Sequence, residues 1–437
     1  MKKVAFNTLG CKVNQYDTEA MTELFEQEGY EVVGFDSIAD VYVINTCTVT
    51  GLSDRKSRQI IRRAKKNNED AIIIVAGCYA QTAPEKVKEL PEVDLIIGTS
   101  NRNRIVEYVR QFEKGTQNIS LVEDIMKVRE YEDLNVTTYK GQTRAFIKIQ
   151  EGCSQFCSYC IIPYARGPVR SRKPDDVINE VKAIAQNGFK EIVLTGIHLA
   201  SYGRDLKETG LLSIMESLQK IDGIERIRLG SLEPTFITSD FVNGVKELDK
   251  VCPHYHISLQ SGCDATLKRM NRKYDTRQYA KAVDLLRDEI PDVAITTDVM
   301  VGFPGETEEE FEATLNFLRE IKLARMHVFK FSPRKGTPAF KFADQIDAVV
   351  KEERSQKLLE LSSQNMDSFM DSFCGRTMSV LFEQELNKGK GLMEGLTKNY
   401  IKVVCEGNTN IQGKILDAKL KEVYDDYIVG EVQCGND

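Results

Sequence analysis

The sequence predicts an α/β protein in three parts, and three observations indicate this fold class. Strand-like and helix-like segments alternate over roughly the first 100 residues, which is typical of a doubly wound parallel sheet. Six further strand–helix units follow, fewer than the eight of a closed barrel, so we expect a partial, open (β/α)6 barrel. The chain then changes to short strands separated by glycines, which predicts a small all-β barrel of the OB or a related kind.

In the first part, each predicted strand is followed by a helix. Amphipathic periodicity predicts a helix over 14–30, with Asn14 as a suitable N-cap. Further helices are expected over the basic segment 55–66, from Pro84 onward and near 101–112. The predicted strands of this part are 3–9, 41–46, 71–77 and 94–98.

The rest of the chain divides at changes of pattern. Residues 113–143 lack strong periodicity and are expected to form a linker or a hairpin. Helices are predicted over 175–188, with Pro174 before it, and over 351–373. The predicted strands are 145–150, 191–196, 226–231, 254–261, 294–302 and 325–332 in the half barrel, then 377–383, 400–406 and two more near the end. The expected domains are therefore 1–112, the linker 113–143, then 144–373 and 374–437.

Composition places the protein among soluble, intracellular chains. Hydrophobic residues make up 41% of the 437 and charged residues 29%, and no segment is long and apolar enough to span a membrane. The start, MKKVAFNTLG, is already strand-like, so we expect no signal peptide, no membrane partner and a cytoplasmic location. In that compartment, 11 cysteines indicate metal ligation rather than disulfides.

Net charge alone disfavours a nucleic-acid partner, because it is −7. The charge is nevertheless unevenly distributed: basic runs occur at 55–66, 165–173 and 268–273. Any one run is typical of a solvated helix face, but three of them, one beside a group of cysteines, favour a polyanion at the active face. The segment from Gly375 onward has 8 basic and 10 acidic residues and shows no such footprint.

Three cysteines each follow one of the first three predicted strands. They are Cys11, Cys47 and Cys78, each one to three residues beyond a strand's carboxyl end. A lone cysteine there is usually a small buried side chain, but open α/β sheets bind ligands at these strand ends, so three can converge. Converged thiolates without histidine suit an iron–sulfur cluster or zinc.

A second group, Cys153, Cys157 and Cys160, has the spacing C-x3-C-x2-C. A closed structural zinc site needs a fourth Cys or His, and the next candidate, His198, lies beyond another predicted strand, where scaffold histidines are common. Three thiolates on a [4Fe–4S] cluster instead leave one iron open for a substrate.

This spacing, just after the first strand of a six-unit βα series and with Tyr159 before the last cysteine, resembles the radical S-adenosylmethionine (SAM) superfamily. Along nearly the whole chain, NTLGCKVNQYDTEAM, VINTCTVT, VAGCYAQ and EGCSQFCSYCIIPYARGPVRSR are similar to the methylthiotransferases of that superfamily. The family's parts are an N-terminal domain with an auxiliary cluster, a radical SAM core and a C-terminal TRAM domain.

Within the family, TLGCKVNQYDTE and EGCSQFCSYC look most like the branch that acts on tRNA bearing N6-threonylcarbamoyladenosine. That branch adds a methylthio group at C2 of the adenine just 3′ of the anticodon. Sister branches act on isopentenyladenosine in tRNA or on an aspartate of a ribosomal protein, and both stay open as alternatives. A non-catalytic iron–sulfur or zinc RNA-binding protein is the alternative from another class.

The resemblance implies two [4Fe–4S] clusters, with Cys11, Cys47 and Cys78 as ligands of the auxiliary one. Cys153, Cys157 and Cys160 would hold the cluster whose open iron chelates SAM. SAM would serve both as methyl donor and as the source of a 5′-deoxyadenosyl radical, which suits an unactivated C–H bond. The implied partners are a tRNA anticodon stem-loop, a flavodoxin- or ferredoxin-like electron donor and a sulfur source.

The resemblance also suggests SAM contacts: Gly196, Glu233, Gln260, Gly302 and Gly305. The segment TGIHL lacks the superfamily's Gly-Gly-Glu form, and VGFPGET also fits a plain strand-to-helix turn capped by Thr307. Glu233 and Gln260 end strands and are placed to line the half barrel.

Three arginines follow the second cysteine group: Arg166, Arg170 and Arg172. We expect them either to bind RNA phosphates or to neutralise the charge of the cluster held by that group.

Overall fold

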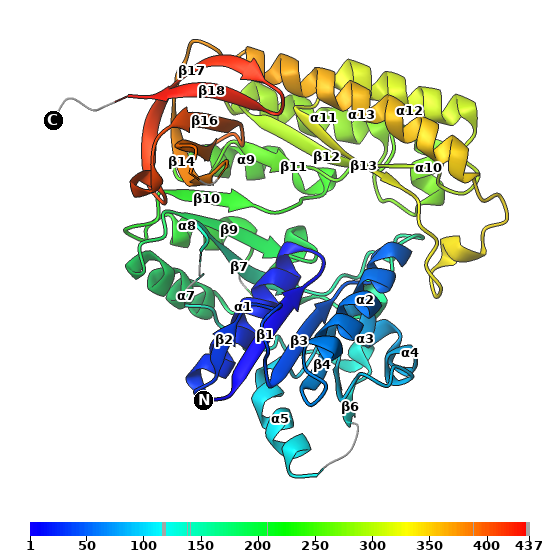
Figure 1. The fold of residues 1–437 in the computed structure, drawn as a ribbon. Coiled ribbons are helices and arrows are strands. Elements are labelled where there is room, and N and C mark those ends of the chain that lie inside the picture. The colour runs from blue at the N-terminus through cyan, green and yellow to red at the C-terminus, as the bar shows by residue number, and fades with distance from the viewer. Residues whose placement is uncertain (116–118, 138, 140, 208, 388, 434–437) are drawn as a thin grey trace.

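The computed structural model describes residues 1–437 apart from 116–118, 138, 140, 208, 388 and 434–437. Its three parts follow one another along the chain, coloured from blue to red in Figure 1. The N-terminal sheet lies at the bottom of that view, the half barrel occupies the middle, and a small C-terminal barrel packs at the upper left. None of the described helices is both long enough and apolar enough to cross a bilayer.

The N-terminal part is a parallel six-stranded sheet with helices on both faces, which confirms the doubly wound prediction. Side chains of its buried strand β3 alternate between two apolar cores. Val41 and Val43 pack with helix α1, and Tyr42 and Ile44 pack with α2 on the other face. The strands, in sheet order, are β2 (Glu31–Val33), β1 (Lys3–Thr8), β3 (Val41–Thr46), β4 (Ile72–Gly77), β5 (Leu95–Ile97) and β6 (Ile119–Leu121). The helices are α1 (Lys12–Gln27), α2 (Gly51–Asn67), α3 (Cys78–Thr82), α4 (Pro84–Lys88) and α5 (Ile105–Glu113).

Two strands of this sheet are not predicted from the sequence, because each is only three residues long. Strand β2 forms the edge beside β1, and β6 extends the other edge parallel to β5. Residues 113–143 therefore contribute a strand to the N-terminal sheet, and among their described residues no hairpin is formed. The order also places a topological switch point between β1 and β3, where such sheets bind ligands.

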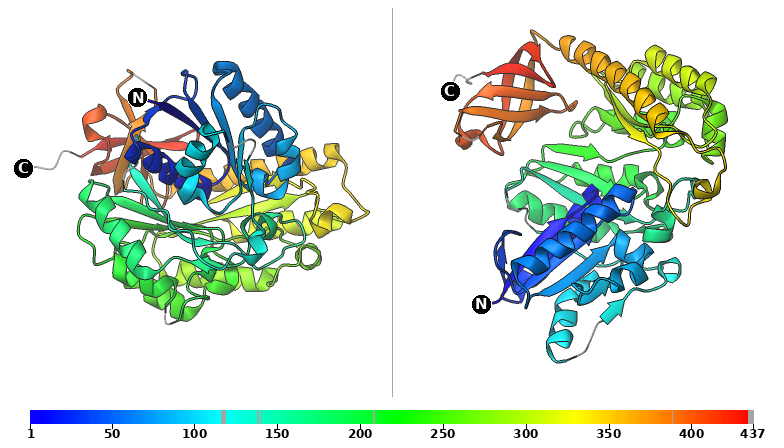
Figure 2. Two further views of the ribbon diagram at one scale, coloured as in Figure 1. Left: turned by 90° about the horizontal axis from the view of Figure 1, so that it is seen from below. Right: turned by 45° about the vertical axis from the view of Figure 1, so that its right-hand side comes forward.

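The second part is an open half barrel of six parallel strands, as predicted. Four-stranded and three-stranded sheets are joined by parallel bridges, Ile227 to Val251 and Leu232 to Ile257. Within the described residues the first and last strands do not pair, so the barrel stays open (Figure 2). The strands are β7 (Arg144–Glu151), β9 (Glu191–Gly196), β10 (Arg226–Leu229), β11 (His254–His256), β12 (Ala294–Val301) and β13 (Arg325–Lys330), with β8 (Arg170–Ser171) antiparallel to β7.

Helices cover the outer face of the half barrel and bury one continuous apolar core. Thr307 caps α12 through a reciprocal capping box with Glu310, which confirms the expected cap. The helices are α6 (Ile162–Arg166), α7 (Pro174–Gln186), α8 (Leu211–Leu218), α9 (Ser239–Lys246), α10 (Asp264–Arg269), α11 (Thr276–Glu289), α12 (Glu308–Ile321) and the long α13 (Ala348–Asp371).

The C-terminal part is a closed five-stranded barrel in the order β14-β15-β16-β18-β17, which confirms a small all-β barrel. Strand β15 is absent from the strands predicted from the sequence, because its glycine weakens the strand pattern. Gly395 is needed there: a Cβ would lie 2.4 Å from the carbonyl oxygen of Leu381. The strands are β14 (Thr377–Glu385), β15 (Leu392–Thr397), β16 (Lys402–Glu406), β17 (Ile415–Tyr424) and β18 (Tyr427–Val432).

This barrel docks against the amino ends of the half-barrel strands, opposite the ends that carry the cysteines. Arg226, the first residue of β10, donates hydrogen bonds to the carbonyl oxygens of Leu396 and Ser379, both at 2.8 Å. The ring of His254, the first residue of β11, stacks on Tyr400 with centroids 4.5 Å apart. The interface is therefore fixed by hydrogen bonds from a buried arginine and by a ring stack.

Arg226→Met is expected to loosen this interface. The substitution leaves two carbonyl groups without their donor, which costs about 1–3 kcal/mol in the free energy of unfolding. Arg376→Met is the matched control, because its ion pair with Asp292 joins the same two parts but is exposed. Limited proteolysis should release the C-terminal barrel faster from the Arg226 variant than from the control, and equal rates would contradict the assignment.

Candidate active site

The first cysteine group lies at the topological switch point of the N-terminal sheet. Cys11 follows β1 and precedes α1, Cys47 follows β3, and Cys78 begins α3 directly after β4. These three strands are neighbours in the sheet, so their carboxyl ends lie side by side. The structure thus places all three cysteines at one edge, as the sequence predicts.

The backbone at Gly10 allows the loop of Cys11 to pack close to Cys47. Gly10 has φ +112°, and a Cβ on it would lie only 3.0 Å from the Cβ of Cys47. The loop carrying Cys11 therefore packs directly against Cys47, an approach that only glycine permits. Burial raises the pKa of the Cys78 thiol to about 11, and although Arg166 opposes this, Cys11 and Cys47 add to it. The three thiols are close enough to influence one another.

The second cysteine group occupies the loop after β7. The amide of Cys160 donates to the carbonyl oxygen of Cys157 at 2.9 Å, which closes a turn. Phe156 adopts φ +50°, an unusual conformation for a non-glycine residue, and Asn271 holds its carbonyl oxygen at 2.9 Å. Burial raises the pKa of Cys160 to about 12, and Cys157 and Cys153 contribute.

Each cysteine group has one buried arginine in contact with a sulfur. Arg166 Nε lies 3.2 Å from Cys78 Sγ, and Arg272 Nη1 lies 3.1 Å from Cys157 Sγ. Such donors stabilise thiolates, and hydrogen bonds to sulfur also tune iron–sulfur clusters. The donor chemistry of both groups therefore fits three-thiolate ligation.

Among the described residues, no three His, Cys, Asp or Glu form a group that could hold a single metal ion. His198 contacts Ser201 and Glu233, at 2.7 and 3.1 Å, and so belongs to the scaffold as expected.

The expected RNA contacts Arg166, Arg170 and Arg172 are corrected by the structure, because all three are buried, at 0%, 2% and 1% exposure. Arg166 and Arg172 pair with interior carboxylates, and Arg170 donates to the carbonyl oxygen of Arg166 at 3.0 Å. No phosphate of a bound RNA can reach them there. The other expectation concerned the second cysteine group, whereas the sulfur that Arg166 contacts is that of Cys78 in the first group.

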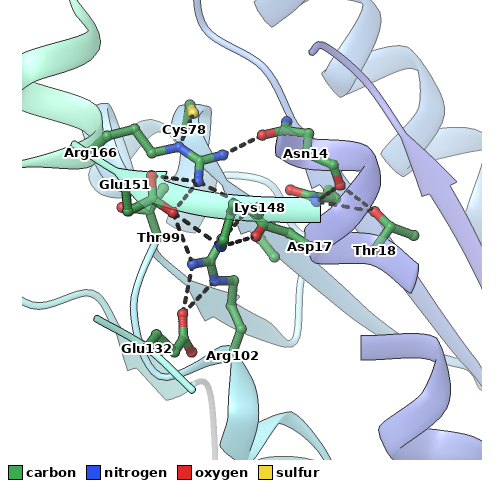
Figure 3. A network of polar contacts seen from close by, with 12 residues as sticks. Asn14, Asp17, Thr18, Cys78, Thr99, Arg102, Glu132, Lys148, Glu151 and Arg166 are labelled. Atoms are coloured by element: carbon green, nitrogen blue, oxygen red, sulfur yellow. Dashed lines mark hydrogen bonds and ion pairs between the residues drawn. The ribbon is translucent and has the colours of Figure 1, made fainter. Parts of the chain in front are cut away.

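Arg166 belongs to a buried network of charges that joins the N-terminal sheet to the half barrel (Figure 3). Asp17 of α1 pairs with Arg102, Lys148 and Arg166. Arg166 also lies 3.0 Å from Glu151 of β7 and donates to the amide oxygen of Asn14. Three cations thus balance Asp17, Glu151 and the less buried Glu132 beside Arg102.

Glu233 is a predicted SAM contact that the structure links to the second cysteine group through a shared arginine. Its carboxylate accepts hydrogen bonds from Arg272 at 3.0 Å and from Gln155 at 3.2 Å, and it faces His198. Because Arg272 also contacts Cys157, Glu233 is one residue removed from that cysteine. Gln155 and Arg272 were missed as site residues; only the basic run 268–273 pointed to the latter.

The other predicted SAM contacts lie near strand ends, and among the described residues none of them makes a hydrogen bond or ion pair to either cysteine group. Gln260 has φ +74° and pairs with β12 by a bridge to Val299. Gly196 leaves room for the Gln150 side chain. Gly302, at φ +68°, donates its amide to Glu306 at 2.7 Å, and Gly305 turns the chain into α12. The VGFPGET segment therefore has the turn role; SAM contact by its glycines stays a prediction.

Comparisons with known proteins identify the family of this chain. Residues 3–98 match "Uncharacterized protein family UPF0004" and residues 147–318 match the radical SAM superfamily. The threonylcarbamoyladenosine tRNA methylthiotransferase MtaB of Bacillus subtilis is 45% identical over 96% of this chain and 94% of its own length. The chain belongs to the radical SAM methylthiotransferase family.

Other methylthiotransferases match along the same length. The tRNA-2-methylthio-N(6)-dimethylallyladenosine synthase of Clostridium tetani is 36% identical, over 97% of this chain and 95% of its own. Among solved structures, the radical SAM methyltransferase TsrM from Kitasatospora setae shares the fold, with TM-score 0.57 at 14% identity over 77% of both chains. As a radical SAM methylthiotransferase, the protein is an enzyme, and its family implies a [4Fe–4S] cluster and SAM.

Proposed function

We propose that this methylthiotransferase adds a methylthio group to C2 of N6-threonylcarbamoyladenosine in tRNA, 3′ of the anticodon. The observation that carries the proposal is the full-length match to the Bacillus subtilis enzyme of that name at 45% identity, against 36% for the dimethylallyladenosine synthase of Clostridium tetani. The latter reaction is the second candidate.

The two cysteine groups lie on two neighbouring sheets, which supports separate roles for them in SAM cleavage and in sulfur transfer. We assign Cys153, Cys157 and Cys160 to the cluster that binds and cleaves SAM. Cys11, Cys47 and Cys78 are assigned to an auxiliary cluster that carries the sulfur. Bound there, the two clusters would supply a radical for C–H activation and a methylated sulfur for transfer. The proposed domains are 1–112, extended by β6, and 144–373 for these two groups, with 374–437 as the TRAM domain.

We assign the binding and orientation of SAM to side chains beside the second cysteine group. Arg272 holds Cys157 and Glu233 together, so the carboxylate faces the SAM site beside the thiols. Gly196, Gln260, Gly302 and Gly305 remain proposed SAM contacts. An electron donor of flavodoxin or ferredoxin type and a sulfur source complete the proposed reaction, which we place in the cytoplasm with its tRNA.

Helix α2 supports an RNA substrate. Arg55, Lys56, Arg62, Arg63 and Lys66 are exposed along it. The helix begins four residues after Cys47, so its basic face extends from the first cysteine group. Cations in this position suit the phosphates of an RNA whose base enters the site.

The test is mass spectrometry of nucleosides from total tRNA of a strain lacking this gene, beside its parent and a complemented strain. Loss of the methylthio form, with accumulation of the threonylcarbamoyl precursor, is expected. Loss of methylthio-isopentenyladenosine would support the second candidate instead. An unchanged profile would reject a tRNA substrate and direct the search to ribosomal proteins.

A further inference from the structure

The inner face of the half barrel is polar and open to solvent. Along β13, Arg325, His327 and Phe329 are exposed while Met326 between them is buried in the core. On the neighbouring strands, His256 of β11 and Asp298 of β12 are partly exposed on the same face, 3.3 Å apart. Alternation of this kind means that one side of these strands lines an accessible space.

Lys12 of the N-terminal sheet projects onto this face. It is the first residue of α1 and follows Cys11 directly. Its Nζ lies 5.9 Å from the ring centroid of Phe146 on β7, and its charge also acts on Arg228 of β10 and His327 of β13. Lys12 is exposed as a whole residue, while partial burial of its amino group between the two parts lowers the pKa of that group.

Positive charge on this face is incompletely neutralised. Arg144 pairs with Glu383, and Arg228 pairs with Glu191 at 2.7 Å. In the part of the chain that the structure describes, neither Lys12 nor the exposed Arg325 has a carboxylate within ion-pair distance, and Asp298 faces His256 instead. The inner face therefore suits an anionic group on the molecule that enters it.

We propose that Lys12 binds the carboxylate of the threonyl group on the substrate adenine and thereby selects this nucleoside. The inference rests on the proposed function. The threonylcarbamoyl substituent ends in a carboxylate, whereas the dimethylallyl group of the alternative substrate is apolar. Because Lys12 is adjacent to Cys11, a base bound there presents its edge to the first cysteine group while its substituent reaches the ammonium group.

The experiment compares two synthetic anticodon stem-loop RNAs on the reconstituted enzyme. One carries N6-threonylcarbamoyladenosine, and the other carries its threoninamide analogue, which lacks the negative charge. We expect the wild type to bind the carboxylate RNA about tenfold more tightly, the effect of one charge-assisted hydrogen bond. Lys12→Gln should abolish that ratio, and Lys12→Arg should retain most of it.

Controls separate specificity from general damage. Lys281→Gln removes a charge from the outer helix α11 and should keep the wild-type ratio. The ratio compares the affinities of one protein preparation for two RNAs. A loss of iron from a variant would therefore affect both affinities alike and leave their ratio unchanged. A Lys12→Gln enzyme that still prefers the carboxylate RNA, or that instead loses SAM affinity, would overturn the inference while the proposed function stands. A wild type that methylthiolates neither RNA would overturn the function itself.

Discussion

Replacing Cys157 with alanine is expected to abolish reductive cleavage of SAM, whereas replacing Cys78 should spare that cleavage and abolish methylthio transfer to RNA. The two residues belong to separate groups, one after β7 of the half barrel and one after β4 of the N-terminal sheet. Each group has its own arginine donor to sulfur, so loss of one thiol should empty one site and leave the other.

The measurement is 5′-deoxyadenosine released by the reconstituted, reduced protein, together with methylthio product on a modified stem-loop RNA. Iron content per chain should fall by about half in either variant. Cys374→Ala is the matched control, because this half-buried cysteine after α13 lies in neither group. Loss of SAM cleavage in the Cys78 variant would show that the two sites are not independent.

The second large effect is expected from Asp17→Asn. Asp17 is fully buried, and its carboxylate pairs with Arg102, Lys148 and Arg166. The isosteric amide leaves these cations partly uncompensated, which should lower the free energy of unfolding by about 3–5 kcal/mol. Glu107→Gln removes an exposed partner of Arg104 and should leave the free energy of unfolding nearly unchanged, because solvent screens this pair. Urea denaturation of both variants measures the difference, and similar midpoints would contradict the network's role.

The same carboxylates predict acid sensitivity. Burial alone would raise the pKa of Asp17, but Arg102, Lys148 and Arg166 outweigh it and hold that pKa well below its usual range. In Glu151 the balance between burial and the cations beside it leaves a pKa of about 2. Unfolded carboxyl groups titrate near about 4, so this stability is complete above about pH 5 and is lost as pH falls toward 2. Asp17→Asn should show a shallower loss of stability over that window.

Sequence alone located the cysteines because their chemistry depends on short spacings and strand ends. Cys11, Cys47 and Cys78 lie where alternating strands bring them, and C-x3-C-x2-C is local. The arginines after the second group illustrate the limit. Arg166 finds its partners in Asn14 and Asp17, about 150 positions earlier, and no local pattern shows that a guanidinium will be buried there.

Lys12 and β15 show two other limits of prediction from sequence alone. In the sequence, Lys12 is one cation at a helix start, and only the packing of α1 beside the half barrel gives it its place. Gly395 lowers the strand propensity of β15, although the close approach of Leu381 requires it. Tertiary contacts decide both cases.

The charged network between α1, β7 and α6 also constrains how such enzymes can be recombined. An N-terminal sheet grafted from a distant relative would have to bring an acid at position 17 to meet the half barrel's Lys148 and Arg166. A chimaera that keeps the cysteines but lacks an acid at position 17 would bury Lys148 and Arg166 at the interface without this partner. The two parts therefore have to be inherited, and engineered, as a single unit.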